Sequence, residues 1–61
     1  MDDYINTAEV AEITRRPEST VAYWRHIGTG PRYARVGKRV LYRRSDVIEW
    51  LDEQFDQAAR A

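Results

Sequence analysis

The first apolar positions of the chain follow a polar residue that favours the start of a helix. Asn6 is followed three residues later by Glu9, the spacing of a capping box, in which each side chain accepts a hydrogen bond from the other residue's backbone N–H. Ile5 and Val10 occupy the two positions that a hydrophobic staple would join. This pattern predicts a helix over about residues 7–14.

A proline and a glycine bound the next run of apolar residues at helical spacing. Pro17 disfavours helical geometry in the residue before it, but it suits the first turn of a new helix. Gly28 is a natural residue to follow the end of that helix. The sequence therefore predicts a tight turn at residues 14–16 and a second helix over about residues 17–27.

Residues 33–42 are rich in β-branched and aromatic side chains and predict a β-hairpin. Two registers are possible: a two-residue loop pairs Val36 with Arg39, whereas a three-residue loop pairs Val36 with Val40. We favour the three-residue loop, because it gathers the apolar side chains on one face. That face would consist of Ala34, Val36, Val40 and Tyr42.

The last apolar stripe has the spacing of a helix over about residues 46–58. Ser45 is the predicted N-cap, and the acids that follow it stand where the helix dipole favours negative charge. The stripe, at positions i, i+3, i+4 and i+8, consists of Val47, Trp50, Leu51 and Phe55.

Helix, tight turn, helix, hairpin and helix is the element order of a winged helix-turn-helix. We therefore predict a mainly α fold with a small β-hairpin wing, in one domain over residues 1–61. A chain of 61 residues has room for one small core. The predicted core consists of Ile5, Val10, Ile13, Val21, Trp24, Ile27, Val36, Val40, Tyr42, Val47, Trp50, Leu51 and Phe55.

The net charge is zero, but the charges are segregated along the chain. Residues 15–44 carry nine Lys or Arg residues and a single acid, Glu18. Residues 1–14 carry four acids and no base, and residues 45–61 carry five acids and one base. This segregation predicts a cationic binding face, with the acids held elsewhere on the surface.

Composition excludes several other classes of function. The chain has no cysteine and one histidine, so we expect no disulfide and no metal site of the usual kind. It carries no nucleophile–base arrangement and no glycine-rich phosphate loop, so we expect neither enzymatic activity nor a cofactor. It has no long apolar run, and its acidic N-terminus is unlike a signal peptide. We therefore expect no membrane association and a cytoplasmic location.

A helix-turn-helix with a basic wing predicts double-stranded DNA as the partner, because the major groove admits an α-helix. The face of the second helix that points away from its apolar stripe is the predicted recognition surface. The predicted contacts of this helix are Ser19, Thr20, Ala22, Tyr23, Arg25 and His26. The predicted contacts of the turn with the DNA backbone are Arg15 and Arg16. The predicted contacts of the wing are Arg35, Lys38, Arg39 and Arg43.

Three segments resemble the MerR-like winged helix-turn-helix family. Tyr4-x-Asn6-Thr7-Ala8-Glu9-Val10-Ala11 resembles its opening helix, and residues 20–28 resemble its recognition helix and the exit from it. Residues 35–51 are similar to the wing and third helix of the excisionase-family branch. The resemblance implies a phage excisionase, or recombination directionality factor. Such a protein works in the bacterial host cell and is associated with the nucleoid when it is bound to DNA.

Free-standing members of this branch bind adjacent DNA sites, bend the DNA and help an integrase to assemble the excisive complex. The chain departs from the family pattern at Arg15-Arg16-Pro17, where the usual turn is Gly-apolar-Ser. Ala22 and Tyr23 also lack the arginine that many relatives carry at one of these positions. Because neither side chain gives a bidentate contact to guanine, we expect modest affinity per protomer and several cooperating copies.

The acidic third helix suggests how copies would cooperate. Its acids would meet the basic face of a neighbouring copy, head to tail, and such contacts do not close on themselves. Two other functions stay open: a small phage or prophage transcriptional regulator, and an antirepressor-like protein-interaction module. DNA bending and integrase-dependent excision distinguish the excisionase from the regulator. Failure to bind any duplex would favour the interaction module.

Overall fold

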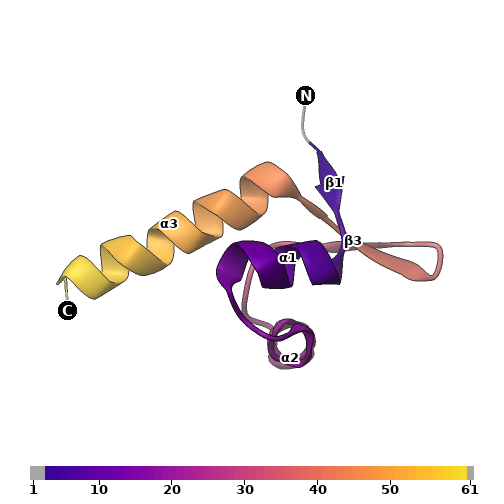
Figure 1. The fold of residues 1–61 in the computed structure, drawn as a ribbon, viewed down its shortest axis with the longest axis horizontal. Coiled ribbons are helices and arrows are strands. Elements are labelled where there is room, and N and C mark those ends of the chain that lie inside the picture. The colour runs from indigo at the N-terminus through magenta and orange to yellow at the C-terminus, as the bar shows by residue number, and fades with distance from the viewer. Residues whose placement is uncertain (1–2, 61) are drawn as a thin grey trace.

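The computed structural model describes residues 3–60, so Met1, Asp2 and Ala61, the ends of the predicted domain, lie outside the described residues. The fold consists of three helices and a small antiparallel sheet, whose hairpin extends away from the helices (Figure 1). The arrangement is a winged helix-turn-helix, as predicted. The elements are β1 (Tyr4–Ile5), α1 (Thr7–Thr14), α2 (Glu18–Ile27), β2 (Ala34–Val36), β3 (Arg39–Arg43) and α3 (Arg44–Arg60).

The predicted capping box fixes the start of α1. The backbone N–H of Glu9 donates to Asn6 Oδ1 at 2.9 Å, and the N–H of Asn6 donates to Glu9 Oε1 at 3.1 Å. Ile5 and Val10 both lie in the core, as the predicted staple requires. Local signals in the sequence therefore define this end of the helix-turn-helix.

The turn between α1 and α2 depends on a left-handed arginine. Arg15 has φ 57°, and its N–H donates to the Glu12 carbonyl at 3.3 Å. The N–H of Arg16 donates to the Ala11 carbonyl at 3.1 Å. These two bonds form a Schellman motif, whose left-handed position usually holds glycine. Pro17 then precedes α2 as its N-cap rather than starting the helix.

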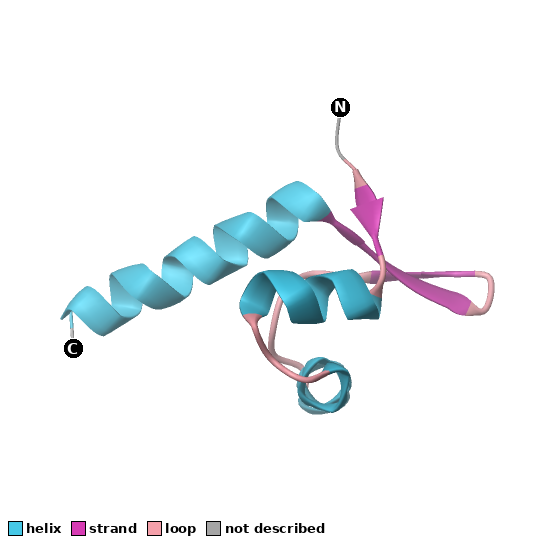
Figure 2. Cartoon of the chain, viewed as in Figure 1, coloured by secondary structure: helices cyan, strands magenta, loops and turns pink. Residues whose placement is uncertain are grey.

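The sheet has three strands, and the sequence analysis missed one of them. β3 is central, with β1 and β2 antiparallel on either side (Figure 2). β1 places Tyr4 opposite Arg43 and Ile5 opposite Tyr42. Two residues are too few to show the alternation that predicts a strand. β1 forms because burial of Ile5 brings it alongside β3.

The predicted three-residue hairpin loop is wrong. The loop has two residues, and Val36 pairs with Arg39. Gly37 has φ 64°, which suits the first position of a type II′ turn, one of the two turns that match the twist of paired strands. This register sends Val36 to the outer face of the sheet, while Val40 packs against the core. The geometry of the turn, rather than the grouping of apolar side chains on one face, therefore sets the pairing register of the hairpin.

Ser45 is not the N-cap of α3, because the helix begins at Arg44. β3 leads into α3 without a loop, so no separate capping residue fits between them. The backbone N–H of Arg44 instead donates to the Asp3 carbonyl at 2.9 Å. The helix ends at Arg60 and extends well beyond the rest of the domain (Figure 1).

The core lies between the sheet and the three helices. Three predicted core residues are exposed instead: Ile27 at 52%, Val36 at 58% and Phe55 at 70%. Ile27 ends α2, and Phe55 lies in the part of α3 that no other element covers. The core consists of Ile5, Val10, Ala11, Val21, Tyr42 and Val47, with Ile13, Trp24 and Val40 packed against it.

Candidate nucleic-acid interface

The outward face of α2 carries three exposed side chains one helical turn apart. Ser19, Tyr23 and His26 follow an i, i+4, i+7 spacing, and 58% of Tyr23 is exposed. Val21, on the opposite face, is fully buried and fixes the rotation of the helix. The half-buried members of the predicted set on this helix are Thr20, Ala22 and Arg25.

The turn brings two basic side chains to the start of α2. Arg15 and Arg16 are both exposed there. The N-cap Pro17 makes no side-chain hydrogen bond to the first turn, so no side chain of the cap satisfies the free N–H groups. Free N–H groups beside arginines favour an anion such as a DNA phosphate. Glu18, the acid of this segment, is exposed in the same first turn.

The wing divides its basic side chains between two faces. Arg35 pairs with Val40, so strand alternation places it on the same face as the inward-facing Tyr42. Arg39 and Arg43 alternate to the outer face. All of the predicted wing contacts, including Lys38 in the turn, are exposed. The structure therefore places Arg35 on the inner face of the sheet and separates it from the arginines of the outer face.

Arg25 turns back into the protein instead of pointing outward. Its Nη1 donates to the Tyr42 hydroxyl at 2.9 Å and to Thr7 Oγ1 at 3.1 Å. Its guanidinium carbon also lies 5.9 Å from the centroid of the Tyr33 ring. Sequence reasoning did not find these partners, because they lie on other elements and no local pattern joins them to Arg25.

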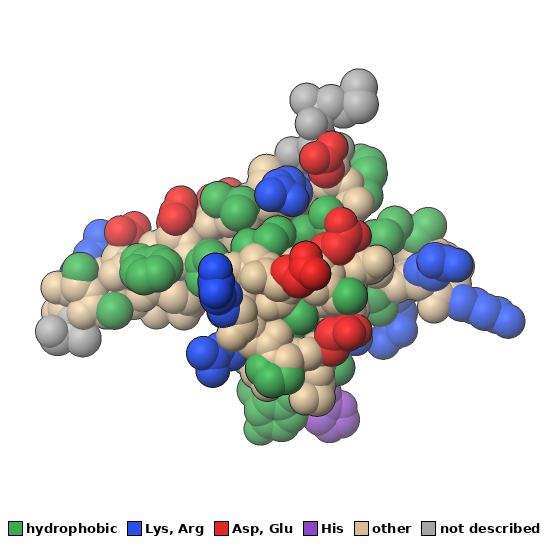
Figure 3. Space-filling model, viewed as in Figure 1, with side chains coloured by type: hydrophobic (Ala, Val, Ile, Leu, Met, Phe, Trp, Pro, Cys, Tyr) green, Lys and Arg blue, Asp and Glu red, His purple; other side chains and the backbone are tan. Residues whose placement is uncertain are grey.

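Acidic and basic side chains are only partly separated on the face that Figure 3 shows, where basic side chains also lie beside the α1–α2 turn and at the end of α3. Figure 3 shows Lys and Arg side chains at the wing end, and Asp and Glu side chains over α1 and along α3.

Within residues 3–60, no group of three His, Asp or Glu side chains is arranged to hold a metal ion. In the same part of the chain, no helix combines the length and apolar character that crossing a membrane requires.

The family model of the helix-turn-helix domain matches residues 4–54, which include α1, the turn, α2, the wing and most of α3. The chain belongs to the helix-turn-helix domain family. Helix-turn-helix domains bind double-stranded DNA, and the family is typically non-enzymatic. It includes excisionase-like DNA-binding proteins. No curated protein and no solved structure matched the chain significantly.

Proposed function

We propose that the chain is an architectural DNA-binding protein of the excisionase type, which binds adjacent sites, bends the DNA and directs an integrase toward excision. The observation that carries the proposal is the position of basic residues beside the exposed face of α2. Arg15 and Arg16 precede that face, and Arg35 lies on the same side of the sheet as Tyr42, whose hydroxyl accepts from Arg25 of α2. With α2 in the major groove, the wing reaches the neighbouring minor groove or backbone.

The exposed side chains of α2 contact different parts of the DNA. Ser19 bonds to a base edge, and Tyr23 and His26 contact bases or phosphates at the groove wall. The half-buried Thr20 and Ala22 let the helix approach closely. None of these side chains gives the bidentate guanine contact of an arginine, so base readout by one protomer is modest.

Cooperative binding of several copies supplies the affinity for DNA that one protomer lacks. One small module buries only about 600–1,000 Å² of protein surface on DNA. Copies on adjacent sites gain from the high effective concentration of their neighbours. This favours a protein that coats a stretch of DNA over one that reads a single site.

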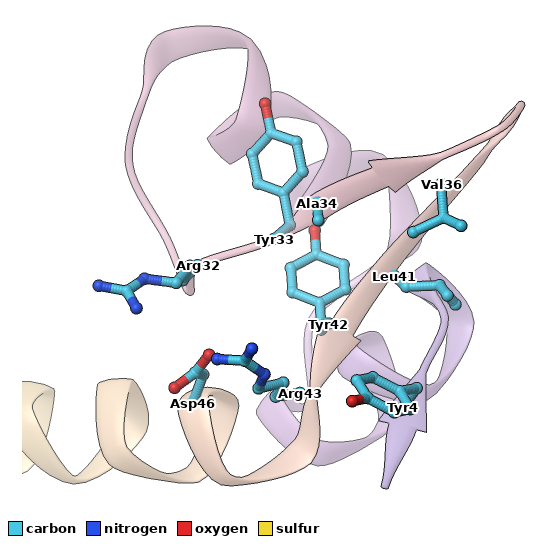
Figure 4. A pocket seen from close by; sticks show the side chains of 9 residues that line it. All are labelled: Tyr4, Arg32, Tyr33, Ala34, Val36, Leu41, Tyr42, Arg43 and Asp46. Atoms are coloured by element: carbon cyan, nitrogen blue, oxygen red, sulfur yellow. The ribbon is translucent and has the colours of Figure 1, made fainter. Parts of the chain in front are cut away.

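The surfaces that would join the copies are the end of α3 and the outer face of the sheet. A groove of about 570 Å³ on that face is lined by Tyr4, Val36 and Leu41, and its charged lining residues are Arg32, Arg43 and Asp46 (Figure 4). On α3, Phe55 is 70% exposed and has Asp52 and Asp56 among its neighbours on the helix. In the proposed contact, Phe55 enters the apolar part of the groove and the acids of α3 face Arg32 and Arg43. The exposed acids of α3 are Glu49, Asp52, Glu53 and Asp56.

Gel-shift titrations on DNA that flanks the protein's own gene test this function. We expect a cooperative ladder of bands on tandem sites and a position-dependent mobility of permuted fragments, which reports bending. Phe55→Ala should keep single-site binding and lose the cooperativity, because Phe55 lies outside the DNA-binding face. Leu41→Ala, in the groove, should have the same effect, because it removes apolar contact without adding charge beside the wing arginines.

Other results of the binding, bending and excision measurements would favour other functions. Specific binding without bending, cooperativity or any effect on integrase-dependent excision would overturn the excisionase role and favour a small transcriptional regulator. Absence of binding to any duplex at low salt would overturn DNA binding and favour a protein-interaction module.

A further inference from the structure

The recognition helix and the wing are joined through one polar side chain. α2 packs mainly against α1, whereas the sheet packs mainly against α1 and α3. Arg25 lies between them, on α2, and donates from one nitrogen to Thr7 of α1 and to Tyr42 of β3. A planar guanidinium with two fixed acceptors holds its neighbours in a defined orientation.

The acceptor on β3 is itself held rigidly. Tyr42 is 2% exposed, and the centroid of its ring lies 6.0 Å from that of Tyr33. Figure 4 shows the two rings side by side, with their hydroxyl groups pointing in the same direction. The Arg25 guanidinium also lies 5.9 Å from the Tyr33 ring centroid. The base of the wing therefore contacts Arg25 through two aromatic side chains.

We propose that Arg25 is a positioning residue that sets the angle between the wing and α2, so that both reach one DNA duplex together. The inference rests on the proposed DNA-binding function for its effect on affinity. Its structural part, the orientation of the wing, does not depend on DNA. Arg25 acts through Thr7 and Tyr42 rather than by contact with the DNA backbone.

Tyr42→Phe separates positioning from phosphate contact. Tyr42 is buried and cannot touch DNA, and the variant removes only the hydroxyl that accepts from Arg25. Thr7→Ala removes the other acceptor and provides a second variant if Tyr42→Phe does not fold. Each variant is combined with the wing double variant Lys38→Ala/Arg39→Ala in a double-mutant cycle of DNA affinity.

If Arg25 positions the wing, the loss of one of its acceptors and the loss of the wing charges should have coupled effects on DNA affinity. The wing double variant should then cost about threefold less affinity in the Tyr42→Phe or Thr7→Ala background than in the unchanged protein. If Arg25 instead binds a phosphate, Arg25→Met should lower the salt slope of binding by about 0.9, with Tyr42→Phe and Thr7→Ala near normal. Strictly additive losses, or that second result, would overturn the proposal.

A measurement without DNA keeps this test separate from the proposed function. The chain has no cysteine, so spin labels at Ile27→Cys and Lys38→Cys report the distance between the end of α2 and the wing tip. Tyr42→Phe should broaden the distance distribution if Arg25 fixes the wing. An unchanged distribution in both acceptor variants would overturn the proposal even if DNA binds as expected.

Discussion

The ring of Trp24 on α2 lies 4.9 Å, centroid to centroid, from the ring of Trp50 on α3, at an interplanar angle of 48°. This tilted contact joins the recognition helix to the long C-terminal helix. Both residues are half-buried, and Trp24 packs against the small core. The pair therefore adds a link between α2 and α3 to the packing of α2 against α1.

Trp50→Ala should lower the free energy of unfolding by about 2–3 kcal/mol, because it removes this packing and leaves a cavity. That loss is a large part of the total stability of about 3–5 kcal/mol expected for a domain of this size. Urea unfolding followed by circular dichroism measures it. Phe55→Ala is the matched control and should change stability by less than about 0.5 kcal/mol. Equal losses for the two variants would contradict the account.

Alanine substitutions at Gly30, in the loop before β2, and at Gly37, in the turn after it, should lower the stability by different amounts. Gly37 has φ 64° with open space around it, so Gly37→Ala should cost about 1 kcal/mol from backbone strain alone. Gly30 has φ 85°, and an added Cβ would lie 2.9 Å from Trp24 Cβ. Gly30→Ala should therefore cost clearly more in the same unfolding measurement. A smaller loss at Gly30 would contradict the packing of Trp24 described above.

Arg15→Gly should stabilise the protein and weaken its binding to DNA. Glycine relieves the left-handed strain at this position, with a net gain in stability of about 0.5–1 kcal/mol after its own entropic cost. Removal of the exposed guanidinium should reduce the salt slope of binding by about 0.9 if it contacts one phosphate. Thermal unfolding and salt-dependent affinity check the two parts. Arg15→Asn, which tolerates the left-handed backbone, is the control for charge.

Local signals in the sequence predicted the helix-turn-helix well. The Asn6–Glu9 capping box and the flanking Pro17 and Gly28 each act within a few residues, so their effects can be read directly. The exposed face of α2 followed from the same reasoning, because burial of Val21 fixes which side points outward.

Features that depend on distant contacts could not be predicted in this way. β1 exists because burial of Ile5 aligns two residues with β3, and the Arg25 contacts join residues on three elements. The wing register failed for a different reason: counting apolar side chains favoured a face that the Gly37 turn does not allow. In the observed register, Val36 lies on the outer face, where it lines the proposed docking groove.

The most direct test of the central claim, that α2 and the wing bind DNA together, is affinity for specific and random duplexes across a salt series. Each phosphate contact adds about −0.9 to the slope of log K against log salt concentration. Lys38→Ala/Arg39→Ala should flatten this slope, whereas Tyr23→Ala should keep the slope and erode the preference for the specific duplex. A slope and a preference that neither variant changes would contradict the account.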